Sequence, residues 1–193
     1  TGIDVTWVNA SGVVCQPANG YLEFDTSGIT TTPSSATLKI YISNILNSGP
    51  EGIYVMRAFF ASAGSLSATD QASYTRDASG ATPDIGDMVK YSSEITSFTD
   101  DQTLEITLNA TALSDMVSRD DFQIAIVTDS LADQHATPSN GITRTITFSS
   151  QNNSTSSQRP VLSYTILDTS SPNLNIKSGI LTLKPGASII IKQ

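Results

Sequence analysis

The sequence predicts an all-β protein: an antiparallel, jelly-roll-like β-sandwich with one short capping helix and a C-terminal β tail. Short segments of alternating apolar and polar residues recur along the chain, separated by Gly, Pro, Asn and Ser. Only 15% of the residues are charged, and β-branched residues are prominent, which is typical of sheet proteins. The 193 residues are enough for one domain with its own core.

Eight or nine strands are expected, enough for two packed sheets. The alternating segments lie at Ile3–Trp7, Leu22–Phe24, Ala36–Ile42, Leu104–Leu108, Phe122–Ile126, Ile142–Phe148 and Leu162–Ile166. The run Ile53–Phe60 is apolar at nearly every position, which favours a strand buried on both faces. Residues 109–117 predict a helix of about two turns that closes one end of the sandwich, because Asn109 is a good N-cap and apolar residues follow at helical spacing.

The composition changes after Asp168 and divides the chain in two. Residues 1–168 are expected to form the sandwich, and residues 169–193 a linker followed by a basic, apolar β tail. So short a segment cannot bury its own apolar face, so we expect it to dock either on its own domain or on a neighbouring subunit. The residues expected to make that contact are Leu174, Ile176, Ile180, Leu183, Ile189 and Ile191.

Charge is distributed unevenly between these two parts. All 18 acidic residues lie in residues 1–168 beside seven of the bases, a net charge of −11, whereas residues 169–193 hold three lysines and no acid. Opposite charge favours docking of a tail on a body and disfavours contact between two bodies. The overall charge of −8 argues against nucleic acid or an anionic membrane as partner. We expect no membrane insertion either, because no apolar run approaches the roughly 20 residues that span a bilayer.

The residues needed for common catalytic sites are scarce. His135 is the single histidine and Cys15 the single cysteine, too few for a zinc site, and no nucleophile elbow or phosphate-binding loop is present. We therefore predict a protein that is not an enzyme and has no catalytic residues. A polysaccharide hydrolase that uses loop carboxylates is a remote alternative, because aspartates are plentiful.

Two kinds of binding site are open to the loop residues. Aspartates favour turns for their local hydrogen bonds, but carboxylates from loops also bind calcium. The alternative is therefore one structural calcium site, with either Asp84 and Asp87 or Asp100 and Asp101 as contributors. No other cofactor is expected. Glycan binding needs exposed aromatic rings, and Tyr74 and Tyr91 flank a long irregular segment where such rings suit.

Five motifs occur in a characteristic order. They are L-x-F-D-x-S-x-I at Leu22–Ile29, A-T-L-K-I-Y at Ala36–Tyr41, L-N-A-T with Val117, F-Q-I at Phe122–Ile124, and F-S-S at Phe148–Ser150 followed by R-P-V-L-S-Y at Arg159–Tyr164. Over about residues 15–167 this order resembles DNRLRE-type domains, the disaggregatase-related repeats, some of which are grouped with carbohydrate-binding modules. The chain departs from that pattern at Ala72–Arg76, where Tyr74 stands in place of tryptophan. The resemblance implies a jelly-roll sandwich on a cell or virion surface, with glycan binding in some members and a purely structural role in others.

These observations predict a non-enzymatic structural or adhesive module at an extracellular, cell or virion surface. It would assemble through its C-terminal tail into a fibre, pilus-like filament or appendage. Its partners would be copies of itself or neighbouring structural subunits. The alternative is a carbohydrate-binding module of a larger secreted protein, with a polysaccharide or cell-surface glycan as partner.

Overall fold

Strands dominate the structure, a computed structural model that describes residues 2–8, 20–46, 52–60, 89–128, 143–168 and 175–180. The described residues form nine strands, one α-helix and one 3-10 turn. The strands are β1 (Gly2–Val8), β2 (Gly20–Asp25), β3 (Ser35–Leu46), β4 (Ile53–Arg57), β5 (Gln102–Thr107), β6 (Asp121–Thr128), β7 (Thr143–Ser149), β8 (Val161–Asp168) and β9 (Asn175–Ile180). The helix is α1 (Ala110–Ser118) and the 3-10 turn η3 is Ser156–Gln158.

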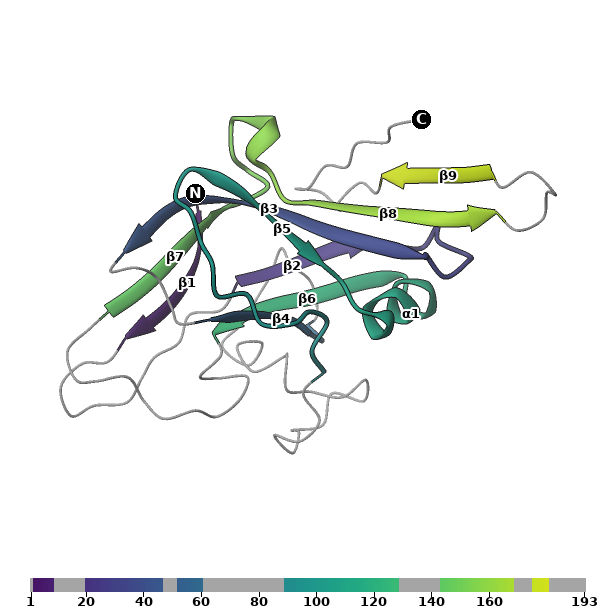
Figure 1. The fold of residues 1–193 in the computed structure, drawn as a ribbon, viewed down its shortest axis with the longest axis horizontal. Coiled ribbons are helices and arrows are strands. Elements are labelled where there is room, and N and C mark those ends of the chain that lie inside the picture. Colours follow the sequence, from purple (N-terminus) through teal and green to yellow (C-terminus); the bar gives the residue numbers. More distant parts are fainter. Residues whose placement is uncertain are drawn as a thin grey trace.

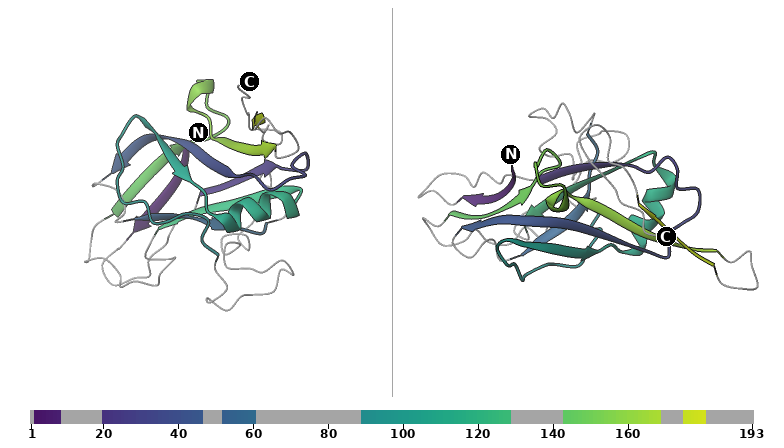
Figure 2. Two further views of the ribbon diagram at one scale, coloured as in Figure 1. Left: turned by 45° about the vertical axis from the view of Figure 1, so that its right-hand side comes forward. Right: turned by 90° about the horizontal axis from the view of Figure 1, so that it is seen from above.

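The strands form two antiparallel sheets that pack face to face. The larger sheet has the order β1-β7-β3-β8-β9, with β5 also paired to β3, and the smaller has the order β2-β6-β4. Figures 1 and 2 show them as two layers, with β3, β5 and β8 in one and β2, β4 and β6 in the other. The predicted all-β antiparallel sandwich is therefore confirmed.

Strand β3 organises the larger sheet because it has neighbours on both sides. Residues Thr37–Ile42 pair with β5 on one side. On the other side Ser35–Lys39 pair with β8, and Ile42–Leu46 pair with β7. Strands β7 and β8 thus lie end to end along one edge of β3, and residues 150–160 leave the sheet between them. Figure 1 shows this segment, which contains η3, rising above the larger sheet.

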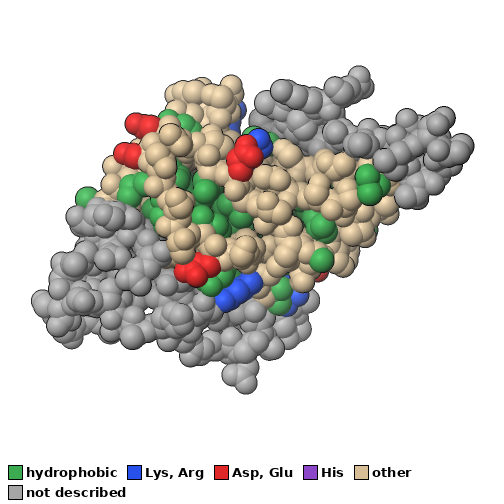
Figure 3. Space-filling model, in the orientation of Figure 1, with side chains coloured by type: hydrophobic (Ala, Val, Ile, Leu, Met, Phe, Trp, Pro, Cys, Tyr) green, Lys and Arg blue, Asp and Glu red, His purple; other side chains and the backbone are tan. Residues whose placement is uncertain are grey.

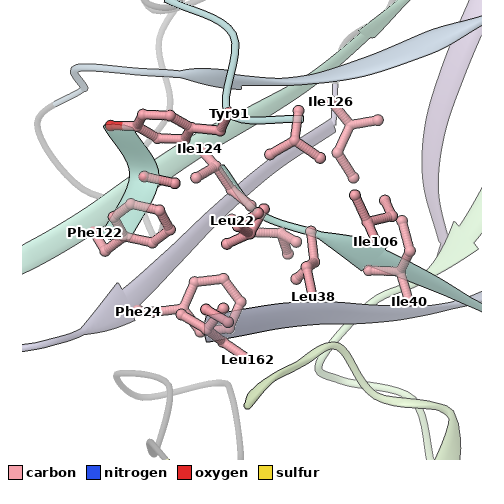
Figure 4. Close-up of a cluster of buried hydrophobic side chains, with 14 of the residues drawn as sticks. Leu22, Phe24, Leu38, Ile40, Tyr91, Ile106, Phe122, Ile124, Ile126 and Leu162 are labelled. Atoms are coloured by element: carbon pink, nitrogen blue, oxygen red, sulfur yellow. The ribbon is translucent and has the colours of Figure 1, made fainter. Parts of the chain in front are cut away.

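The core between the sheets follows the alternation seen in the sequence. In β3 the residues Ala36, Leu38, Ile40 and Ile42 are buried, whereas the residues between them are only partly buried. Phe24 of β2 and Phe122 of β6 meet them from the facing sheet. Figure 4 shows Leu38 and Ile40 of one layer together with Phe24 and Phe122 of the other. Period-2 alternation therefore identified the inward faces of these strands correctly.

Strands β4 and β6 are buried on both faces, as the dense apolar run at Ile53–Phe60 predicted for β4. Their outer faces belong to a second apolar cluster, formed by Tyr54, Met56, Ala58, Phe60, Ala125 and Val127. Gln123 of β6 is buried in the same region, where its amide nitrogen donates to the Phe60 carbonyl (2.7 Å) and its amide oxygen accepts from the Phe60 backbone N–H (3.0 Å). One side chain therefore satisfies both backbone groups of a residue beyond the end of β4.

The expected helix is present as α1 and lies at one end of the sandwich (Figure 1). Asn109 caps it by accepting a hydrogen bond from the Ala112 backbone N–H at 3.1 Å. The Asn109 side-chain amide also donates to the Lys90 carbonyl at 2.7 Å, which joins the helix to the segment beside β4. Ala112 and Met116 are fully buried against the core. Within the described residues no helix is long and apolar enough to cross a membrane.

Candidate functional site

The tail begins as an additional strand of the larger sheet. Strand β9 pairs with β8 in antiparallel register, from Asp168 opposite Asn175 to Ser163 opposite Ile180. Two of the predicted contact residues, Ile176 and Ile180, thus lie in β9. The others, Leu174, Leu183, Ile189 and Ile191, lie outside the described residues.

The distal half of this strand pair has no support from β3. Pairing of β8 with β3 ends where Thr165 faces Ser35. The last three residues of β8, Ile166–Asp168, therefore pair only with β9 among the described strands. Figure 1 and the right-hand view of Figure 2 show the β8–β9 pair projecting beyond the sandwich as a ribbon. Two strands without a supporting layer are only marginally stable in water.

The outer edge of the larger sheet is formed by the two terminal strands. Strand β1 pairs with β7, and β9 pairs with β8, so both lie on the side of β7 and β8 that faces away from β3. Neither has a second neighbour among the described strands. An edge strand presents a row of backbone N–H and C=O groups that another strand can bind. The first and last described strands thus both supply edges suited to strand addition.

Large exposed hydrophobic side chains mark the two ends of this sheet. In the described part of the chain they are Leu46 at 47% exposure and Leu167 at 43%. Leu46 ends β3 opposite Thr145 of β7, and Leu167 lies in the projecting part of β8 opposite Ile176. Single exposed leucines are ordinary on protein surfaces, so these two residues do not by themselves define a contact surface.

Tyr91 is not the exposed aromatic platform that the sequence suggested for glycan binding. Its side chain is fully buried. The ring lies beside that of Phe122 in Figure 4. The two rings are stacked, with centroids 5.2 Å apart and an interplanar angle of 16°. The Tyr91 hydroxyl donates to Asp115 of α1 at 2.5 Å. The ring is part of the core, because residues 89–95 form bridges with β4 at Lys90 and Ile95.

A polar network surrounds the Tyr91 hydroxyl. The Asp115 carboxylate also lies 3.8 Å from the Arg57 guanidinium, and Arg119 donates to the Ala58 carbonyl at 3.0 Å. Both guanidinium groups lie over the Phe59 ring, at 5.3 Å for Arg57 and 4.3 Å for Arg119. Burial, and then the Asp115 carboxylate, raise the Tyr91 pKa far above its ordinary value, so the phenol stays neutral. These contacts fasten α1 to the end of β4.

Asp100 and Asp101 lie in the turn before β5, where both are exposed. The Asp101 backbone N–H donates to the Asp100 carboxylate at 3.2 Å, and Asp101 has a φ of 55°, a left-handed conformation that aspartate tolerates better than most residues. No group of three His, Cys, Asp or Glu side chains suited to a metal ion occurs among the described residues. The hydrogen bond between Asp100 and Asp101 is that of a turn, and Asp101 also accepts from the Tyr41 hydroxyl. The other calcium candidates, Asp84 and Asp87, and the glycan candidate Tyr74 lie outside the described residues.

Tyr41 is an aromatic residue that the sequence analysis did not select. It lies on the outer face of the larger sheet, opposite Thr103 of β5, and its hydroxyl is 3.4 Å from the Asp101 carboxylate. Partial desolvation, and then Asp101, raise its pKa. Lys39 and Glu105 form an ion pair on the same face. The sequence does indicate that Tyr41 faces outward, because Tyr41 lies between Ile40 and Ile42, which face inward.

Charged side chains are dispersed in the described part of the face shown in Figure 3. Hydrophobic side chains gather along its middle, with acidic and basic side chains scattered around them. The described part of this face therefore has no basic stripe of the kind that follows a nucleic-acid backbone.

No family model matches the chain, and no curated protein matches it. The resemblance to DNRLRE-type domains therefore remains a prediction.

Proposed function

We propose that the protein is a non-enzymatic structural or adhesive module of an extracellular, cell or virion surface, which assembles through its C-terminal tail into a fibre, pilus-like filament or appendage. The observation that carries the proposal is the position of β9. It extends the larger sheet at a projecting ribbon, and its outer edge has no partner among the described strands. A strand in this position can join one subunit to the next through backbone hydrogen bonds.

The charge distribution supports the same function. The body carries −11 and the tail +3. Bodies repel one another, so contacts between subunits are favoured where a tail meets a body. A contact between different surfaces of two copies can repeat and build an open chain.

Deletion of residues 169–193 tests this function. The full chain should form multimers that grow with protein concentration, measured by light scattering after size exclusion and by electron microscopy. The truncated chain should stay monomeric and folded, because every residue of the described core precedes Asp168. Circular dichroism checks the fold of the truncated chain. A full chain that stays monomeric at all concentrations contradicts the proposal.

A matched variant separates the charge of the tail from its apolar residues. Replacing Lys177, Lys184 and Lys192 by glutamate keeps every apolar residue and reverses the charge. Assembly should weaken at low salt, and the difference from the natural chain should shrink at high salt because ions screen exposed charges. If the two chains assemble equally at low salt, the charge of the tail does not drive assembly, and strand addition is the remaining cause.

A second function, carbohydrate binding, is favoured by Tyr41. An aromatic ring on an open sheet face beside carboxylate, hydroxyl and amine groups can stack on a sugar and bind its hydroxyls. On a glycan array, Tyr41→Ala should abolish binding, whereas Tyr41→Phe should retain most of it because the ring remains. Thr107→Ala, on the same face but farther along β5, is the matched control. Binding that survives Tyr41→Ala places the glycan elsewhere.

A further inference from the structure

Strand β9 is held less firmly than the strands inside the sheet. Its pairing runs over six residues of β8, from Ser163 to Asp168. The first three of these are backed by β3, and the last three have β9 as their only partner among the described strands. Strand pairs at a projecting edge open more readily than those in the core. Detachment of β9 leaves the described core between the two sheets in place.

A second copy of the chain offers the same binding site for β9. The contact with β8 is made through backbone pairing in a fixed register, and a β9 strand from another chain has the same sequence. Exchange therefore restores each lost pair on the neighbour. Because the end of β8 projects from the sandwich, as Figure 2 shows, a neighbour can reach it without bringing two acidic bodies together.

The chain between the two strands is long enough for the transfer. Residues 169–174 connect β8 to β9, and a fully extended segment of that length spans about 20 Å. The contact of β9 with its acceptor keeps the same charges after the transfer, because the body that Lys177 leaves and the body that it joins both have a net charge of −11.

We propose that β9 is exchanged between copies: β9 of one chain pairs with β8 of the next in the register seen within the single chain, with Ser178 opposite Thr165. This proposal rests on the proposed function and specifies its contact. The partner is a second copy of this chain, and the acceptor is the outer edge of Ser163–Asp168. Reciprocal exchange gives a closed dimer, and sequential exchange gives an open chain.

Paired cysteines distinguish exchange from pairing within one chain. Thr165→Cys and Ser178→Cys are introduced together into a Cys15→Ser background, since directly opposed residues of an antiparallel pair are close enough to form a disulfide. The reduced protein is concentrated until multimers form and is then oxidised. Denaturing electrophoresis without reductant should show covalent dimers or ladders. A portion oxidised while dilute should instead be locked as monomers, which assemble only after reduction.

The matched control places cysteines at Thr37 and Thr107, which are opposed on β3 and β5 of the larger sheet, away from β9. This pair should give disulfides within single chains only, at every concentration. Covalent dimers or ladders from it would mean that whole domains open, which overturns the assignment to β9.

Two further outcomes distinguish a failure of β9 exchange from a failure of the proposed assembly function, on which the exchange rests. If multimers form and the disulfide of the Thr165→Cys, Ser178→Cys variant lies wholly within single chains, exchange is wrong, and the module assembles through another contact of its tail. If no multimers form with either pair or with the natural chain, both the exchange and the proposed function fail.

Discussion

The two sheets of this sandwich differ in how they meet their surroundings. In β6 of the smaller sheet, every residue from Phe122 to Thr128 is buried. In β3 of the larger sheet, burial alternates from Ala36 to Ile42, and the outer face carries polar residues. The smaller sheet therefore has apolar clusters on both faces, whereas the described side chains of the larger sheet contribute to a cluster on one face. Alternation in the sequence thus marks a sheet with one open face, and its loss marks a sheet enclosed on both sides.

The largest effect should come from substituting consecutive residues in each sheet. In β6, Ile126→Ala and Val127→Ala should both destabilise the protein, by about 2–4 kcal/mol each, because the two side chains fill clusters on opposite faces. In β3, Ile40→Ala should cost a similar amount, whereas the neighbouring Lys39→Ala should cost less than about 0.5 kcal/mol. Urea denaturation measures these values. A negligible cost for Val127→Ala would show that the second face is not a true core.

The next largest loss of stability is expected from Gln123, whose buried side chain joins β6 of the smaller sheet to the Phe60 backbone. Gln123→Leu removes both hydrogen bonds to the Phe60 backbone and leaves a buried N–H and C=O without their partner. A loss of about 2 kcal/mol in the free energy of unfolding is expected. The control is Gln102→Leu at an exposed position of β5, which should change stability by less than about 0.5 kcal/mol. Equal effects of the two changes would contradict the structural role given to Gln123.

A smaller effect, dependent on pH, is expected at the junction of α1 with the smaller sheet. Tyr91→Phe removes the hydrogen bond to Asp115 and should cost about 1–2 kcal/mol near neutral pH. The fold raises the Tyr91 pKa above its unfolded value near 10, so the unfolded chain ionises first, and this part of the stability is lost as the pH rises above about 10. The difference between the natural chain and Tyr91→Phe should therefore shrink in alkali. Denaturation at several pH values checks the trend, and a difference that grows above pH 10 would contradict it.

The smallest effect is expected on the open face of the larger sheet. Lys39 and Glu105 form an ion pair whose side chains are 40% and 59% exposed. Because water and salt screen such pairs, Glu105→Gln should change stability by less than about 0.5 kcal/mol. Urea denaturation at low and high salt measures the effect. A loss above about 1 kcal/mol would mean that the outer face is covered in the folded protein. The larger sheet would then be enclosed on both faces, as the smaller sheet is.

Much of the fold could be predicted from the sequence, because it depends on local patterns. The alternation at Ala36–Ile42 identified the inward face of β3, and Asn109 with its following apolar residues identified α1. Tyr91 was misplaced because its burial depends on Phe122, a residue distant in the sequence, and on bridges from its segment to β4. No pattern within a few residues of Tyr91 carries that information.

For the candidate assembly site, the sequence predicted that the tail docks but not where it docks. The charge and apolar content of the tail indicated that it must dock somewhere, but its acceptor depends on strand pairing across the sheet. That β8 would extend past the start of β3 follows from the register of Thr165 with Ser35, which period-2 alternation alone does not specify. Tyr41 was different, since its outward orientation followed directly from the alternation.

The interruption between β7 and β8 has a practical consequence for engineering. Both strands are held in register by β3, so neither depends on the length of residues 150–160. The base of that segment is closed by its own bonds, with the Asn153 amide donating to Ser149 and Gln158. A peptide epitope grafted at residues 154–157 would stand clear of the sheet. If the protein assembles into a fibre as proposed, the epitope would be displayed once per subunit.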